Sequence, residues 1–405
     1  MRSSDDAAAK IRKRRAMSRV LTIVSLISFA TALFSRAVDP IIPPIARDLR
    51  TDPATVALLA TAFALPFALV QPILGPVADV LGKPRVMLVC LVVVIAAAFL
   101  GAVARDFPFL LAMRVVGGIA AGGIFPVALA IIGDVVPVQE RQVAIGRYLT
   151  FTITGNLLGS LFAGVIGDIV GWRAVFVAVG ACSTGTLAAA LLAFRGVKIP
   201  APPPLALKAV PASYRAILSN PRAWTCYGAV FLEGLAIFGL FPYVALLLLG
   251  RGEARASIAG LILTGFALGG VVYAVAVRIL LLRFRQSRLM IAGGVCVAVA
   301  MLGAGLGTWW PIELGIFAVL GFGFYMLHGC IQVQATEIAP RARGAAMALH
   351  SFAFFVGQAV GPVLYGFGFA HLGQPPTLAV AALIMLSVGL ACARLLGERR
   401  TLPMP

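Results

Sequence analysis

The sequence predicts an all-α integral membrane protein with twelve transmembrane helices, and two observations lead to that fold class. First, 61% of the 405 residues are hydrophobic and only 12% are charged, whereas soluble domains carry about 25% charged residues. Second, apolar runs of roughly 20 residues, the helical length that crosses about 30 Å of hydrocarbon, recur along the whole chain. We expect transmembrane spans at residues 20–44, 55–74, 86–104, 109–133, 145–167, 174–194, 223–249, 257–279, 289–307, 312–334, 344–369 and 376–396.

The distribution of basic residues predicts how the chain crosses the membrane. Twelve spans place both termini on one side, and most Lys and Arg residues lie on that side, including the run KIRKRR at 10–15. Because loops rich in Lys and Arg stay in the cytoplasm, we expect both termini to be cytoplasmic and the chain to be a multi-pass protein of the inner (plasma) membrane. The basic residues behind the net charge of +18 are therefore expected to interact with the lipid bilayer rather than with nucleic acid.

The chain divides into two similar halves. The segment 195–222 is basic and rich in proline, which is typical of a linker. At an offset of 202 residues, glycines of span five coincide with glycines of span eleven, namely Gly155 with Gly357, Gly159 with Gly361 and Gly164 with Gly366. We therefore expect two pseudo-symmetric six-helix bundles at 20–194 and 223–396, cytoplasmic tails at 1–19 and 397–405, and a substrate path between the bundles.

The first cytoplasmic hairpin, GPVADVLGKPRVML at 75–88, combines glycines, a carboxylate and two cations. Its glycines permit a tight turn, and its charges suit a helix end at the membrane surface. The hairpin resembles the loop between spans two and three of the major facilitator superfamily, G-x-x-x-D-[RK]-x-G-[RK]-[RK], with departures at positions 80 and 84. In that family the loop locks one half against the other; a topology anchor is the alternative. The resemblance implies conformational gating by Gly75, Asp79, Gly82, Lys83 and Arg85.

The resemblance extends to spans four, five and eleven. Span four reads RVVGGIAAGGIFP at 114–126, similar to the family pattern R-x-x-Q-G-x-G-A, whose arginine is linked to proton movement. Arg114 is costly in lipid and must face the interior, so an interhelical hydrogen-bond anchor is the other interpretation. Drug and proton antiporters carry G-x-x-x-G-P-x-x-G-G in span five, where Ser160 here replaces the proline. Close helix packing is predicted at Gly155, Gly159, Gly164, Gly357, Gly361, Pro362 and Gly366.

The stretch LFSRAVDPIIPP at 33–44 places two charges in the first apolar run. Arg36 and Asp39 are three residues apart and share one helical face, so we expect them to pair and to turn toward the cavity between the halves. We interpret Asp39 as a protonation site. The positive charge of Arg36 favours the charged carboxylate, and burial favours the protonated form. An ion pair that fixes span one to its neighbours is the alternative. Antiporters that resemble this chain often carry an acidic residue late in span one, which favours the first interpretation.

Other polar residues inside the spans are candidates for the proton or substrate path. Glu233 in span seven must be neutral, paired or in contact with water, which fits either a functional carboxylate or a buried structural hydrogen bond. His328 and His350 can titrate near neutral pH, but a core histidine with satisfied hydrogen bonds is the more usual finding. Asn156, Gln332 and Gln358 either line a substrate path or, as is more usual, link helices by hydrogen bonds.

These features predict a secondary active transporter that works by alternating access. The resemblance to twelve-span drug and proton antiporters and to arabinose-type sugar exporters implies proton-coupled efflux of a small amphipathic compound or drug, or of a sugar. Uptake symport of a sugar, organic acid or amino acid is the alternative, and a non-transporting membrane sensor on the same fold is the alternative of another class. We expect a monomer that binds a small-molecule substrate, protons and lipid, with no enzymatic activity, cofactor or metal site.

Overall fold

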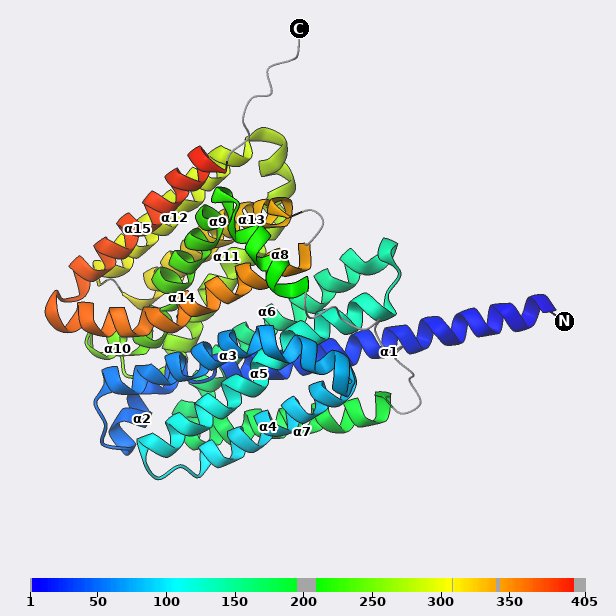
Figure 1. Ribbon diagram of the computed structural model, residues 1–405. Helices are drawn as coiled ribbons and strands as arrows, with labels where there is room; N and C mark the ends of the chain where they lie inside the picture. Colours follow the sequence, from blue (N-terminus) through cyan, green and yellow to red (C-terminus); the bar gives the residue numbers. More distant parts are fainter. Residues whose placement is uncertain (1, 195–208, 308, 340–342, 397–405) are drawn as a thin grey trace, which may run out of the picture.

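The computed structural model describes residues 2–194, 209–307, 309–339 and 343–396, and these ranges contain helices and turns but no strand (Figure 1). They hold 12 helical segments long and apolar enough to cross a membrane, which confirms the predicted all-α membrane fold. The first half consists of α1 (Arg2–Arg36), η1 (Asp39–Ile41), α2 (Ile42–Asp48), α3 (Pro53–Leu81), α4 (Lys83–Ala102), α5 (Phe107–Val135), α6 (Val138–Ile169) and α7 (Trp172–Phe194).

The second half repeats this order after α8 (Ala209–Leu218), a helix within the segment expected to be a linker. In both halves the first span is broken into pieces. The first-half span runs through α1, η1 and α2, and the seventh span runs through a short π-helix and a 3-10 turn. The second-half elements are α9 (Pro221–Glu233), η2 (Gly234–Phe238), η3 (Phe241–Tyr243), α10 (Val244–Leu249), α11 (Ala256–Arg283), α12 (Gln286–Gly305), α13 (Trp310–Ile338), α14 (Arg343–His371) and α15 (Gln374–Leu395).

Most helix ends lie within a few residues of the predicted span limits. The largest differences are at α3, which continues to Leu81 beyond the predicted limit at 74, and at α6, which begins at Val138 before the predicted limit at 145. In both cases the helix extends past the apolar run. The helix α1 begins at Arg2, so the segment 1–19, for which a cytoplasmic tail is expected, is helical from that residue on. The tail 397–405 and linker residues 195–208 lie outside the described residues.

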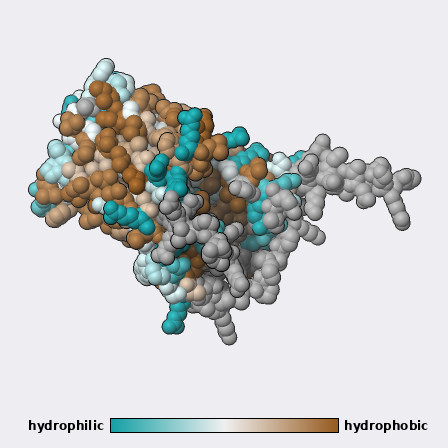
Figure 2. All heavy atoms as spheres, turned by 90° about the horizontal axis from the view of Figure 1, so that it is seen from above, coloured by the Kyte–Doolittle hydropathy of each residue, from teal (hydrophilic) through white to brown (hydrophobic). Residues whose placement is uncertain are grey.

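The outer surface of the bundles is apolar, as a lipid-facing surface must be. Figure 2 shows hydrophobic residues over most of the face that is turned upward in Figure 1, which belongs to the second half. Large aliphatic side chains stay exposed there and on neighbouring helices, for example Val275, Leu282 and Leu383. In water such a surface would be a strong aggregation hazard, whereas in a bilayer it meets hydrocarbon.

The small residues predicted in spans five and eleven lie where helices approach closely. A Cβ atom at Gly155 would lie 2.5 Å from the carbonyl oxygen of Phe29 on α1, and one at Gly361 would lie 2.6 Å from the Cα of Gly239. Any larger side chain would push these helices apart. Gly159, Gly164, Gly357 and Gly366 make comparably close approaches to Leu33, Ala256, Phe231 and Tyr243.

The two halves meet along the pairs α3–α14 and α6–α11 and at the ends of the spans remote from the N-terminus, where η1 and α2 contact η3 and α10 (Figure 1). At that remote end, the Asp168 carboxylate on α6 accepts hydrogen bonds from the backbone amides of Ala256 and Ser257, both at 2.8 Å. A carboxylate is favourable at a helix N-terminus, so the first half caps a helix of the second. On α3–α14, the Thr61 hydroxyl donates to the Ala359 carbonyl at 2.7 Å.

Candidate transport site

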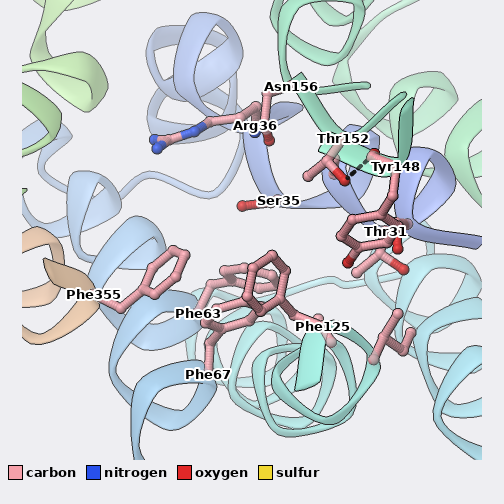
Figure 3. Close-up of a pocket in the computed structure, with 14 residues that line it drawn as sticks. Thr31, Ser35, Arg36, Phe63, Phe67, Phe125, Tyr148, Thr152, Asn156 and Phe355 are labelled. Carbon is pink, nitrogen blue, oxygen red and sulfur yellow. Dashed lines mark hydrogen bonds between the residues drawn. The ribbon is translucent and has the colours of Figure 1, made fainter. Parts of the chain in front are cut away.

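A cavity lies between α1, α3, α5 and α6, and α14 of the second half contributes one side chain to its wall. Figure 3 shows its two kinds of lining: polar groups from α1 and α6 on one side and phenylalanine rings on the other. The polar residues are Ser28, Thr31, Ser35, Arg36, Tyr148, Thr152 and Asn156, and the rings are Phe63, Phe67, Phe125 and Phe355. The cavity therefore offers an amphipathic lining to a small molecule.

The hydroxyl groups of Ser28 and Tyr148 are buried in this wall, where the two side chains are 4% and 1% exposed. The Tyr148 hydroxyl is within reach of those of Ser28 and Thr152, but its hydrogen bonds to them are not of ideal geometry. Because a poorly paired buried polar group is costly, this group of hydroxyls suits water or the polar part of a ligand. Of this wall the sequence predicted only Arg36 and Asn156 as candidates for the path. The signal for the rest was polar residues at helical intervals, at 28, 31 and 35 on α1 and at 148 and 152 on α6.

The break in the first span places the charged pair at the edge of the cavity. α1 ends at Arg36, and Pro40 in η1 lacks the amide hydrogen that would bond to the Arg36 carbonyl. The Ser160 hydroxyl on α6 donates to that carbonyl instead, at 3.3 Å. The serine that replaces the family's proline thus compensates for a proline in the neighbouring span.

Arg36 bonds to groups of both halves. Its Nη1 lies 3.5 Å from Oδ2 of Asp39, as the spacing predicted, and its Nη2 donates to Oε1 of Gln358 on α14 at 3.2 Å. The guanidinium also lies over the rings of Phe238 and Phe241, 4.7 and 5.2 Å from their centroids. Asp39 is 2% exposed. The structure therefore brings Arg36, Asp39 and Gln358 together at the interface of the halves.

Arg114 lies deeper in the first half and is 1% exposed. It donates to the carbonyl oxygens of Phe34 at 2.9 Å and Ser35 at 3.1 Å, in the last turn of α1, and to that of Leu59 on α3 at 3.3 Å. Carbonyls at a helix end lack intrahelical partners, and the Arg114 guanidinium donates hydrogen bonds to two of them, those of Phe34 and Ser35. This geometry favours the interhelical anchor over the proton-path interpretation.

Glu233 and the two histidines form a separate cluster in the second half. Glu233 is 0% exposed, and its Oε2 lies 2.7 Å from Nδ1 of His328 on α13. The His328 ring is edge-on to that of His350 on α14, with centroids 5.1 Å apart. Oε1 of Glu233 and Nε2 of His350 are buried and have no partner among the described residues. Glu233 ends α9 immediately before the π-helix η2, and such bulges are frequent at functional sites.

The remaining predicted polar residues lie elsewhere. Gln332 is exposed on α13 and does not line the cavity described above. In the hairpin, Gly82 has a φ of 95°, which glycine adopts readily, and Lys83 Nζ lies 2.5 Å from Oδ2 of Asp134 at the end of α5. Arg85 is exposed, while the side chains of Gly75 and Asp79 lie outside the described part.

Comparison with known proteins identifies the family. The family model described as Major Facilitator Superfamily matches residues 24–255 and 252–404. Quinolone resistance protein NorA of Staphylococcus aureus (strain COL) is 24% identical over 353 residues, covering 85% of this chain and 88% of that protein. Multi-drug resistance efflux pump PmrA of Streptococcus pneumoniae is 27% identical over 387 residues, covering 93% and 94%.

Solved structures give the same fold. A D-xylose–proton symporter matches with a TM-score of 0.72 at 16% identity, covering 93% of this chain and 96% of that one. A bacterial homolog of the human lysosomal transporter Spinster, in an inward-facing and unoccupied conformation, matches with a TM-score of 0.69 at 20% identity, covering 94% and 95%. The residues matched by the family model span both halves, and this chain belongs to the Major Facilitator Superfamily.

Proposed function

We propose that this transporter exports a small amphipathic compound in exchange for protons. The observation that carries the proposal is the Arg36–Asp39 pair, which lies at the edge of a two-sided cavity and also contacts the second half. The two relatives whose names state drug resistance, at 24% and 27% identity, support export of a drug-like compound.

The lining of the cavity favours an amphipathic compound over a sugar. Phe67 of the first half and Phe355 of the second lie with ring centroids 4.4 Å apart, and Phe63 stacks on Phe67 at 5.8 Å. This continuous ring surface suits a planar apolar face, since aromatic contacts add about 0.5–1.5 kcal/mol per pair beyond burial. The hydroxyls of Ser28 and Tyr148 on the opposite wall would bond the polar edge of the same compound.

The ion pair provides a route for coupling. When the halves rock, the contacts of Arg36 with Gln358 and with the two phenylalanine rings must break or re-form, because those partners belong to the other half. A proton on Asp39 removes the negative partner of Arg36. Protonation of Asp39 and the movement of the two halves therefore both change the contacts of Arg36. Such a shared group can couple proton binding to alternating access.

The sign of the coupling depends on the charge of the compound. With Asp39 protonated, Arg36 keeps a positive charge that repels a bound cation by roughly 2 kcal/mol at about 8 Å and an effective dielectric constant of about 20. Proton and cation therefore exclude each other, and exclusion produces antiport. An anion would instead bind together with the proton, which is symport. The free donors that Arg36 presents at the cavity keep proton-coupled uptake of an organic acid as the second candidate.

Direction follows from orientation. We propose that both termini are cytoplasmic, because the basic residues gather on their side. Protons then enter down their gradient, and each charge that moves with them gains roughly 2.3 kcal/mol per 100 mV of potential. Exchange of one inward proton for one outward monovalent cation moves no net charge, so the pH difference alone drives it, whereas exchange of more than one proton per cation is driven by the potential as well.

The test uses proteoliposomes with an imposed pH gradient and two charged probes, tetraphenylphosphonium and an aromatic carboxylate such as naphthoate. Antiport predicts pH-driven movement of the cation against the proton, and symport predicts movement of the anion with it. Asp39→Asn should stay folded and inserted yet lose pH-driven transport of either probe. Asp48→Asn is the matched control, because Asp48 is a half-exposed carboxylate paired with Arg173 at the end of the same span. Undiminished transport by Asp39→Asn across a range of pH would overturn the proposed coupling.

A further inference from the structure

The hairpin between α11 and α12 carries four exposed arginines. They are Arg278, Arg283, Arg285 and Arg288. None of the four forms an ion pair or a side-chain hydrogen bond with another residue that the structure describes. The chain has no Asp or Glu between Glu253 and Glu313, so no neighbour in the sequence neutralises them. Because a guanidinium group keeps its charge at any physiological pH, this α11–α12 hairpin, residues 278–288, is a permanently positive patch.

The corresponding hairpin of the first half has its own counterion. At the offset of 202 residues that relates the halves, Arg285 corresponds to Lys83. Lys83 is buried and forms an ion pair with Asp134, but the residue that corresponds to Asp134 is the uncharged Thr336. The second half has therefore kept the cation and not the carboxylate. The partner of Arg285 is either water or an anion that the described residues do not supply.

The α11–α12 hairpin lies at the surface of the hydrocarbon layer and not beyond it. Only Phe284 and Arg285 join the two helices (Figure 1). The helix α12 has 20 residues, which at 1.5 Å per residue span about 30 Å and just cross the hydrocarbon, so its first turn reaches the headgroups. Leu281, Leu282 and Phe284 are exposed beside the arginines, Leu282 by 80%. Such a mixture suits a lipid surface, where arginine side chains reach the phosphates while their stems stay in hydrocarbon.

We propose that the α11–α12 hairpin binds an anionic phospholipid of the leaflet on the side of the N-terminus, with Arg285 and Arg288 on its phosphate and Leu282 and Phe284 against its acyl chains. Arg285 immediately precedes α12, and Arg288 lies in the first turn. A guanidinium group binds phosphate oxygens through two parallel hydrogen bonds. A zwitterionic lipid offers the same phosphate, but its own cation offsets the attraction. This lipid site does not depend on the proposed transport of protons or of any compound.

The experiment counts bound lipids on the purified full-length chain in detergent by native mass spectrometry. The probes are dioleoyl phosphatidylglycerol, which is anionic, dioleoyl phosphatidylcholine, which is zwitterionic, and inorganic phosphate. We expect the wild type to bind phosphatidylglycerol more tightly than phosphatidylcholine. The double variant Arg285→Gln with Arg288→Gln should lose about 25-fold in affinity for phosphatidylglycerol, because each arginine near an anionic headgroup contributes about fivefold. Its affinity for phosphatidylcholine should change little.

The matched control removes two other arginines from the same side of the second half. Arg215→Gln with Arg222→Gln serves this purpose, because both side chains are exposed and both precede the seventh span. Equal losses in the two double variants would show that net charge and not the hairpin determines lipid binding, which overturns the proposal. Equal affinity of the wild type for the two lipids overturns it as well.

Inorganic phosphate separates a lipid site from a site for a free anion. Displacement of phosphatidylglycerol by inorganic phosphate would show that the hairpin binds a soluble anion, and the lipid assignment would be wrong. The melting temperature checks that each variant is folded, as expected for substitutions of exposed side chains. If the double variant does not fold, Arg288→Gln alone replaces it and should lose about fivefold in affinity for phosphatidylglycerol; an unchanged affinity would contradict the proposal.

Discussion

The breaks in the first and seventh spans share a 3-10 turn that contains a proline, but only the seventh span has a π-helix before it, and the side chains at the two breaks differ in charge. Asp39–Pro40 begins the 3-10 turn η1, and Phe241–Pro242 begins η3 at an offset of 202 residues. At the same offset, Arg36 corresponds to Phe238. The Arg36 guanidinium lies over both of the phenylalanines that occupy the corresponding positions in the other half. The duplicated backbone therefore supplies a cation on one side of the interface and ring faces on the other.

The two breaks also satisfy their free carbonyls in different ways. In the first half, Arg114 bonds to Phe34 and Ser35, and the Ser160 hydroxyl bonds to Arg36. In the second half, the amide of Leu240 donates to Ile237 and leaves the Ala236 carbonyl, which accepts from the Tyr365 hydroxyl at 2.6 Å. The carbonyls of the first break are bonded chiefly by a buried cation, Arg114, and the carbonyl of the second is bonded by a neutral hydroxyl, that of Tyr365. We therefore expect substitutions at the first break to lower the stability of the protein more.

The largest effect is expected from Arg114→Met, which leaves the carbonyls of Phe34 and Ser35 at the end of α1 without their donor. We expect a loss of about 2 kcal/mol or more, at about 1 kcal/mol or more for each unsatisfied group. Thermal unfolding of the detergent-purified protein measures it. Arg105→Met is the control, because Arg105 is exposed in the loop between α4 and α5. An unchanged melting temperature in Arg114→Met would mean that Arg114 does not stabilise the end of α1.

The sequence made the helices and the charged pair predictable, but not the contacts that give them roles. Apolar length alone locates the spans, and a separation of three residues alone places Arg36 beside Asp39. The approach of Gln358, by contrast, joins residues more than 300 positions apart, and no local pattern encodes it. Arg114 was expected as a possible interhelical anchor, but the carbonyls that it and Ser160 bond to were not predictable, because they depend on where α5 and α6 cross α1.

The helices α3 and α11, which begin at the ends of the halves remote from the N-terminus, are capped in different ways. Asp52 caps its own helix by accepting from the Thr55 amide at 2.9 Å, whereas α11 receives its cap from Asp168 of the other half. Asp168→Ala should weaken the contact between the halves by about 1–1.4 kcal/mol, a shift of up to about tenfold in the open population. Spin labels at positions 105 and 372 measure the separation. Asp52→Ala should leave that distance distribution unchanged, and an equal response in both variants would contradict a cross-half latch.

The neutral break should respond less than Arg114. Tyr365→Phe removes the hydroxyl that the Ala236 carbonyl accepts from, and we expect a loss of about 1 kcal/mol with no change in the charge of the site. The measurement is again the melting temperature. Tyr227→Phe serves as the control, because Tyr227 is also a buried tyrosine of the second half and its hydroxyl has no partner among the described residues. A loss for Tyr365→Phe as large as that for Arg114→Met would mean that the two breaks do not differ in sensitivity.

The smallest expected effect tests the neutral part of the charged break. Ser160→Ala removes the hydroxyl that replaces the missing Pro40 amide, and its 3.3 Å bond to the Arg36 carbonyl is long, so we expect a loss of about 0.5–1 kcal/mol. Ser183→Ala on α7 is the matched control. Ser183 is 0% exposed, and its hydroxyl has no partner among the described residues, so its removal should be neutral or slightly stabilising. If the two alanine variants lose equal stability, the Ser160 hydroxyl does not replace the missing amide, and Arg114 alone supports the first break.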